Sequence, residues 1–229
     1  MTKQSFMLIG LAIAFGPLAI RMGWFGFPLY WLVVDLLILA GAYLTRSHRV
    51  FGKTPTGTLP LWSWWVFLPY LSYTLLVWNL SRVLSREQPY NRVTDNLVVG
   101  RRLLAEEQIG EFTNYVDLTA EFSEPREFRE SIAYISFPIL DAGALEPEEL
   151  RKAVTSLKPG RTFVHCAQGH GRTGLFSLAM LIASGIATSV EDGLQKLQRA
   201  RPGIRLNKEQ LRCVEAFARL IAERGSLLC

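Results

Sequence analysis

The stretch His165-Cys166-Ala167-Gln168-Gly169-His170-Gly171-Arg172-Thr173-Gly174 decides the fold of this 229-residue chain. A β-like run, 161–164, precedes it, and an apolar run that is typical of a buried helix, 175–183, follows it. A strand, a glycine-rich turn and a helix in this order gather backbone N–H groups around one point and direct a helix N-terminus at it. The stretch therefore predicts an anion-binding site.

Two side chains of the stretch give this site its chemistry. Cys166 can attack as a thiolate, because a helix N-terminus and a nearby arginine both favour the negative charge. The planar guanidinium of Arg172 can hold two oxygens of a phosphoryl group. We expect the loop between them to bind phosphate through Ala167, Gln168, Gly169, His170, Gly171 and Arg172. The pattern predicts a site that attacks phosphorus with sulfur.

A thiolate that displaces an alkoxide or phenolate needs a proton donor on the opposite side. Asp141 is the candidate, on a loop after a predicted strand and 25 positions before Cys166. A turn-forming role beside Gly143 is the structural alternative. Asp117 is the rival acid, and its place inside a strand-like run favours a structural role.

The motif His-Cys-x5-Arg-Thr resembles the signature of the cysteine-dependent protein tyrosine and dual-specificity phosphatases. The longer form His-Cys-x-x-Gly-x-Gly-Arg-Thr-Gly is similar to the loop of the lipid-phosphatase branch. The resemblance implies a mainly parallel α/β sheet flanked by helices and hydrolysis through a cysteinyl-phosphate, with no metal or other cofactor. It matches Asp141 to the general acid, expects Thr173 to donate a hydrogen bond to the sulfur, and expects His165 to support the loop.

Two flanking segments extend the resemblance. The run Tyr90-Asn91-Arg92 is similar to the opening of the mitochondrial-type phosphatases that act on phosphatidylglycerophosphate. Segment 201–210 resembles the closing segment of the family, in which Gln210 would orient the hydrolytic water or cap a helix. Lipid-phosphatase loops carry lysines where this chain has Gln168 and His170, so a phosphorylated protein and a phospholipid both remain candidate substrates.

The rest of the C-terminal part alternates strands and helices, which predicts a mainly parallel sheet covered by helices. Strands are expected at 113–119 and 131–138, after a short strand that ends at Gly100. Helices are expected at 101–112, 147–157, 190–199 and 208–223. Ser189 with Asp192, and Asn207 with Gln210, are typical of helix starts.

The N-terminal part is strongly apolar. Stretches 5–20, 24–44 and 61–80 predict an α-helical transmembrane region at 1–80 of about three helices, with tryptophans near the ends of the third and Pro69 as a kink. A linker at 81–92 and a catalytic domain at 93–229 follow. We expect an integral inner- or plasma-membrane protein. Basic residues do not fix the topology, and the reduced thiol favours a cytoplasmic catalytic domain.

Charge and cysteine content limit the alternatives. Residues 1–80 hold five Lys or Arg and one Asp, whereas residues 81–229 hold 20 Lys or Arg and 19 Asp or Glu. The basic excess therefore flanks the bilayer and does not indicate nucleic-acid binding. Three cysteines, Cys166, Cys213 and Cys229, form no disulfide framework or zinc pattern. Cys213 is predicted in the core, with a redox role as the alternative.

The basic positions Arg199, Arg201 and Arg205 are interpreted as contacts for acidic substrates or as a solvated surface. Two other function classes remain open. One is a catalytically silent phosphate-binding membrane adaptor, which does not need the nucleophile. The other is a sulfur-transfer enzyme, which the Arg172-Thr173 pair and Asp141 disfavour.

Overall fold

The structure is a computed structural model that describes residues 3–107, 110–131 and 133–226. Two compact units divide these residues. The first unit holds the chain up to Thr54 together with 58–85 and 120–123. The second unit holds 55–57, 86–119 and the chain from Glu124 onward. Each unit has its own secondary structure and is described separately below.

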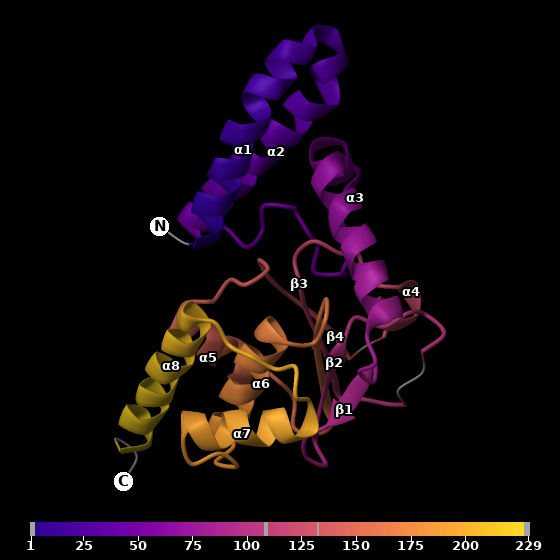
Figure 1. The fold of residues 1–229 in the computed structure, drawn as a ribbon. Helices are drawn as coiled ribbons and strands as arrows, with labels where there is room; N and C mark the ends of the chain where they lie inside the picture. The colour runs from indigo at the N-terminus through magenta and orange to yellow at the C-terminus, as the bar shows by residue number, and fades with distance from the viewer. Residues whose placement is uncertain (1–2, 108–109, 132, 227–229) are drawn as a thin grey trace. The chain divides into compact units, whose positions relative to one another are not determined.

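The first unit is helical. It contains α1 (Lys3–Met22), the 3-10 helix η1 (Gly23–Gly26), α2 (Phe27–Thr45) and α3 (Leu61–Leu84). Helices α1 and α2 pack side by side (Figure 1). Their close approach needs Gly26, because a Cβ there would lie 2.3 Å from the Ala19 carbonyl oxygen. By length and composition alone, one helical stretch of the described chain, Lys3–Thr45, is long and apolar enough to cross a membrane.

Helix α3 is kinked, as Pro69 predicts. Phe67 has non-helical dihedral angles, φ −104° and ψ 23°, two positions before the proline. The indole Nε1 of Trp31 on α2 donates to the Val66 carbonyl oxygen at 2.7 Å, next to this distortion. Helix α2 therefore makes a hydrogen bond to the backbone of α3 beside the kink.

The second unit is built on a five-stranded sheet in the order β1-β2-β5-β3-β4. Its strands are β1 (Tyr90–Arg92), β2 (Leu97–Arg101), β3 (Asn114–Thr119), β4 (Tyr134–Ile139) and β5 (Thr162–Cys166). Strand β1 pairs antiparallel with β2, and all other pairs are parallel. The mainly parallel α/β sheet is thus confirmed. The carboxyl ends of its parallel strands meet at one edge, where such sheets place their ligands.

Five helices accompany the sheet in the described part of the second unit: α4 (Arg126–Arg129), α5 (Pro147–Thr155), α6 (Gly171–Ala183), α7 (Val190–Ala200) and α8 (Lys208–Ser226). Figure 1 shows α5 to α8 gathered on one side of the sheet. The helices predicted at 147–157, 190–199 and 208–223 are confirmed. So is the capping box of α8, in which Gln210 Oε1 accepts from the Asn207 N–H at 3.1 Å and Asn207 Oδ1 accepts from the Gln210 N–H at 2.9 Å.

Both faces of the sheet are buried, and β5 contributes to each in turn. Val164 and Cys166 belong to the larger core beneath α5 to α8. Phe163 belongs to a smaller core on the other face, with Tyr115 of β3. Because successive strand residues point to opposite faces, His165 shares the side of Phe163, and its ring stacks on that phenyl ring with centroids 5.5 Å apart.

The helix predicted at 101–112 is wrong among the residues that can be described. Arg101 is the last residue of β2, and the next residues form a loop and turn. The Glu107 carboxylate closes this turn by pairing with Arg101 at 2.6 Å and accepting the Leu104 N–H at 2.9 Å. The apolar spacing that suggested a helix places Leu103 in the smaller core instead. Residues 108–109 of the predicted helix lie outside the described residues.

Strand and linker boundaries also differ from expectation. Strand β4 begins at Tyr134, three positions after the predicted start. Helix α3 runs on through Leu84, and β1 begins at Tyr90. The segment without regular structure before the sheet is therefore shorter than 81–92.

Candidate active site

The candidate site begins where β5 ends. Cys166 is the last residue of β5, and α6 starts at Gly171, so residues 167–170 form the turn between them. Cys166 is 4% exposed, and its Sγ accepts the Gly169 N–H at 3.3 Å. At least one loop N–H is therefore turned toward the sulfur, as an anion cradle requires.

Gly169 fixes the path of this loop. It has a φ of +75°, and a Cβ there would lie 2.4 Å from the Gly100 carbonyl oxygen at the end of β2. The loop therefore presses directly on the neighbouring strand, and only glycine meets both conditions.

Arg172, in the first turn of α6, is buried and faces the loop after β4. Its Nη1 donates to the Ile139 carbonyl oxygen at 3.0 Å, and its Nη2 lies 3.1 Å from Asp141 Oδ1. The Asp141 side chain is 71% exposed, whereas that of Arg172 is 2% exposed. The predicted phosphate ligand and the predicted acid are thus in contact, and the acid stands at the solvent side of the pair.

The loop that carries Asp141 is held from α8. Ala142 has a positive φ of 54°, and its carbonyl oxygen accepts from Asn207 Nδ2 at 2.7 Å. Gln210 Nε2 donates to the Gly143 carbonyl oxygen at 3.1 Å. The start of α8 therefore determines where Asp141 lies. Because Gln210 also closes the α8 capping box, both polar atoms of its side chain are engaged in this structure.

Thr173, the third residue of α6, is fully buried. Within the described chain its Oγ1 makes no hydrogen bond, so the expected bond to the Cys166 sulfur is not formed in this conformation. Cys213 lies in the same core as Cys166, and its thiol donates to the Leu145 carbonyl oxygen at 3.0 Å. This placement agrees with the predicted packing role of Cys213.

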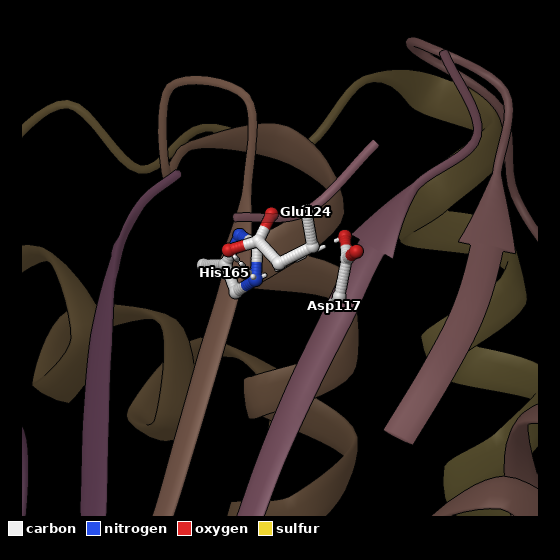
Figure 2. A group of neighbouring side chains, drawn as sticks. All are labelled: Asp117, Glu124 and His165. Atoms are coloured by element: carbon white, nitrogen blue, oxygen red, sulfur yellow. Dashed lines mark ion pairs between the residues drawn. The ribbon is translucent and has the colours of Figure 1, made fainter. Parts of the chain in front are cut away.

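His165 lies on the opposite face from Cys166, between two carboxylates. Its Nε2 is 3.8 Å from Asp117 Oδ1 and 3.7 Å from Glu124 Oε1, and all three side chains are fully buried. Figure 2 shows both carboxylates turned toward the ring. Asp117, the rival acid of the sequence analysis, is therefore sealed within the fold.

Each carboxylate of this cluster also accepts hydrogen bonds from its neighbours. The Tyr115 hydroxyl donates to Glu124 Oε1 at 2.9 Å, and the Tyr134 hydroxyl donates to Asp117 Oδ2 at 2.7 Å. Burial, followed by the charge of Glu124, raises the pKa of Tyr115 well above its ordinary value. Burial, followed by the charge of Asp117, does the same to the pKa of Tyr134.

Among the residues that the structure describes, these three side chains form a group whose ligand atoms lie within 4.8 Å of one another, close enough to hold a metal ion. Asp117 Oδ1 already accepts the Thr119 hydroxyl at 2.7 Å, and Arg102 Nε lies 3.3 Å from Glu124 Oε2. A guanidinium and hydroxyl groups therefore already surround these carboxylates. The three side chains thus form a buried ionic cluster on the face of the sheet opposite Cys166.

We compared the chain with known protein families, sequences and solved structures. Neither a protein-family model nor a curated protein matches the chain. Several solved structures match the fold of this chain. Tk-PTP in its active form has 20% identity and a TM-score of 0.50, over 57% of this chain and 97% of its own. PTPMT1 has 17% identity and a TM-score of 0.50, over 60% and 98%. A mouse putative dual-specificity phosphatase has 19% identity and a TM-score of 0.51, over 62% and 96%.

This chain contains the dual-specificity phosphatase fold. Each of these matches spans nearly the whole of the other protein and about three fifths of this one. The expected fold is therefore confirmed, together with the structural resemblance to PTPMT1. At these identities the likeness concerns the fold alone.

Within the dual-specificity phosphatase fold of this chain, Arg201 differs from the interpretation that we drew from the sequence. Arg199 and Arg205 are exposed, but Arg201 is 1% exposed and is not part of a solvated basic surface. Its Nε donates to the Gly169 carbonyl oxygen, and its Nη2 donates to the Gln168 carbonyl oxygen, both at 3.0 Å. Burial lowers its pKa, and the nearby Glu87 opposes that shift.

His170 makes a contact that the sequence did not indicate. Its Nε2 lies 2.7 Å from Glu87 Oε2, and Glu87 is a residue that the sequence analysis did not single out. The only sequence signal for this pairing was an acidic residue in an otherwise basic juxtamembrane segment, 83 positions away. In this structure His170 Nε2 is therefore directed at the Glu87 carboxylate.

Proposed function

We propose that the protein is a membrane-anchored, cysteine-dependent phosphatase that hydrolyses phosphate monoesters. The observation that carries the proposal is the contact between Arg172 and Asp141 beside the loop that begins at Cys166. It puts a phosphate-binding guanidinium and a carboxylic acid together at the edge of the sheet where the nucleophile lies. A silent phosphate-binding adaptor needs neither the acid nor the thiol.

In the first step the Cys166 thiolate attacks phosphorus. A sulfur–phosphorus bond forms, and the bond from phosphorus to the leaving oxygen breaks. Asp141, in its protonated form, gives its proton to that oxygen. Arg172 and the N–H groups of 167–172 stabilise the charge on the three remaining phosphoryl oxygens.

In the second step water attacks the cysteinyl-phosphate. The phosphorus–sulfur bond breaks, and the Cys166 thiolate returns as the leaving group. Asp141, now ionised, accepts the proton from the attacking water, and inorganic phosphate is released. Thr173 and Gln210 are proposed to assist this step, by a hydrogen bond to the sulfur and by orienting the water, after local side-chain rearrangement.

The Arg172–Asp141 pair sets the order of events. A phosphate dianion that enters the loop competes with Asp141 for the same guanidinium Nη2. Because the Asp141 side chain is exposed, it can turn toward the leaving group when phosphate takes its place. Substrate binding would therefore release the acid for its task.

Membrane anchoring rests on where the apolar surface lies. Nearly all exposed large hydrophobic side chains of the described chain fall within residues 6–84, and only Tyr90 and Ile186 lie beyond. Trp24, Phe25 and Trp65 are 89%, 82% and 74% exposed. Apolar surface of this extent is typical of a bilayer contact. We therefore assign 1–80 to the membrane, with 93–229 as the catalytic domain on its cytoplasmic side.

Anchoring places the site near lipid phosphates, so the substrate is proposed to be a membrane phospholipid such as phosphatidylglycerophosphate or a phosphorylated protein. The deciding experiment uses the full chain purified in detergent. Phosphate release is measured from phosphatidylglycerophosphate in mixed micelles, a phosphotyrosine peptide and a phosphothreonine peptide. A preference for the lipid of about a hundredfold in kcat/KM, equivalent to about 3 kcal/mol, would identify it as the substrate.

Cys166→Ser is the matched control. A hydroxyl is a far weaker nucleophile than a thiolate at neutral pH, so the variant should lose all measurable turnover while it still binds tungstate, a phosphate analogue. Retained turnover in Cys166→Ser would overturn the mechanism. An inactive wild-type protein that binds tungstate would favour the adaptor.

A further inference from the structure

Arg201 is a fully buried guanidinium whose hydrogen bonds run to the phosphate loop and to the segment before β1. Nε and Nη2 donate to the carbonyl oxygens of Gly169 and Gln168. Nη1 donates to the Gln88 carbonyl oxygen and to Asn91 Oδ1, both at 2.8 Å. One side chain thus ties two loop carbonyls to residues that precede them by about eighty positions.

Glu87 completes this connection. Its Oε2 lies 3.1 Å from Arg201 Nη2 and 2.7 Å from His170 Nε2. Gly203 leaves the room for this contact, because a Cβ there would lie 2.4 Å from both Glu87 Oε1 and His170 Nε2. The carboxylate therefore bridges the arginine to a third position of the same loop.

We propose that Glu87 and Arg201 act as positioning residues that hold the 167–170 loop in its anion-binding conformation. The proposal deepens the proposed function, on which it rests. An anion cradle needs its N–H groups turned inward, so its carbonyl groups must turn outward and find donors elsewhere. Arg201 supplies those donors to Gln168 and Gly169, and the Gly169 N–H is then free to face the Cys166 sulfur.

Only an arginine can do this at position 201. The planar guanidinium presents five N–H donors in a fixed fork, and here it meets four hydrogen-bond acceptors and the Glu87 carboxylate from one buried position. A lysine has three donors on a single nitrogen and cannot reach both sides of the fork. A loop that is already held in this conformation pays a smaller free-energy cost of rearrangement when phosphate binds.

The position of Glu87 in the chain gives the contact a further consequence. Helix α3 ends at Leu84, so Glu87 lies in the short segment that leads from the last N-terminal helix into β1. Glu87, which contacts both His170 and Arg201, therefore lies just after the proposed membrane region in the sequence and outside the phosphatase motif.

The test compares Glu87→Gln and Arg201→Lys with the wild-type full chain in detergent. Glu87→Gln keeps the shape of a side chain that is 32% exposed, so it should fold even where Arg201→Lys does not. Tungstate affinity is measured by calorimetry, and kcat and KM are measured on a phosphate monoester. We expect tungstate binding about tenfold weaker in each variant, as loss of a charge-assisted hydrogen bond implies. The melting temperature of Glu87→Gln should change little.

Arg199→Met is the control, because Arg199 is an exposed arginine on the adjoining helix α7. It should bind tungstate like the wild type. Wild-type tungstate affinity in Glu87→Gln, or an equal loss in Arg199→Met, would overturn the positioning role. Failure of the proposed function has a different signature: a wild-type chain that hydrolyses none of the phosphate monoesters, whatever the tungstate affinities of the variants.

Discussion

At the scale of single residues, two buried arginines do different work at one loop. Arg172 contacts the Ile139 carbonyl group and the solvent-exposed carboxylate of Asp141. Arg201 contacts the loop's own carbonyl groups from behind. Because their partners differ, we propose that Arg172 binds the substrate phosphate and that Arg201 positions the loop.

Replacement of Asp141 by asparagine tests the competition at Arg172. Asp141→Asn removes the proposed general acid, so kcat should fall by about 10²–10⁴-fold. It also removes the negative charge that occupies the guanidinium, so tungstate should bind more tightly than to the wild type. Steady-state kinetics and calorimetry on the same preparation give both numbers. Tungstate binding that weakens in Asp141→Asn would contradict the competition.

At the scale of elements, β5 separates two chemical environments by its alternation. Cys166 faces the helices, whereas His165 faces the other side and meets the carboxylates of Asp117 and Glu124. Strands β3 and β4 add the tyrosines that cap this cluster. Cys166, the proposed nucleophile, is thus preceded on the same strand by a buried histidine that lies between two carboxylates.

The tyrosines of the cluster predict how stability depends on alkaline pH. The folded pKa values of Tyr115 and Tyr134 lie above the ordinary value near 10. Their stabilising contribution is therefore complete below pH of about 10 and is lost as pH rises further, because the unfolded chain then ionises its tyrosines first. Urea unfolding across this range should show stability falling above about pH 10. Replacing both residues by phenylalanine should make that fall shallower.

The loop between β5 and α6 gives a second prediction at this scale. Gly169→Ala and Gly185→Ala both place a side chain at a positive φ, +75° and +70°, but only Gly169 would strike a neighbour, Gly100. Gly185→Ala should lower the free energy of unfolding by about 1–2 kcal/mol. Gly169→Ala should lower it more and should abolish tungstate binding. Equal effects of the two variants would show that the contact with Gly100 is not needed.

At the scale of the whole molecule, the chain joins an apolar helical unit to a phosphatase-fold unit. Exposed hydrophobic side chains concentrate in the first unit, and the second unit keeps its apolar residues in two cores around the sheet. This contrast is the physical basis for proposing that one unit is solvated by lipid and the other by water.

The proposed membrane anchoring predicts which treatments extract the full chain from a bilayer. Contacts between apolar side chains and lipid tails are insensitive to ionic strength, whereas attraction between basic residues and lipid headgroups is screened by salt. Membranes that contain the full chain should therefore retain it through high-salt and alkaline washes and release it only to detergent. Sedimentation followed by immunoblotting measures this. Release by salt alone would show that the chain is held at the surface by charge.

The sequence by itself determined the features that depend on neighbours along the chain. Periodicity and turn residues predicted the helices from 147 onward and the kink of α3 at Pro69, and the Cys166–Gly174 pattern predicted the strand–loop–helix. Local patterns could not predict the loop and turn that follow Arg101, because the Glu107 carboxylate and the burial of Leu103 decide that segment through tertiary contacts.

Only the tertiary structure decided which charges are buried and with what partner. Arg199, Arg201 and Arg205 are equivalent in sequence, and Arg201 alone lies under the loop. Its partner Glu87 is more than a hundred positions away, and no periodicity links them. Burial of a charge is favourable only where the fold supplies opposite charge and hydrogen bonds. Such pairings therefore arise from the packed fold and cannot be derived from local sequence.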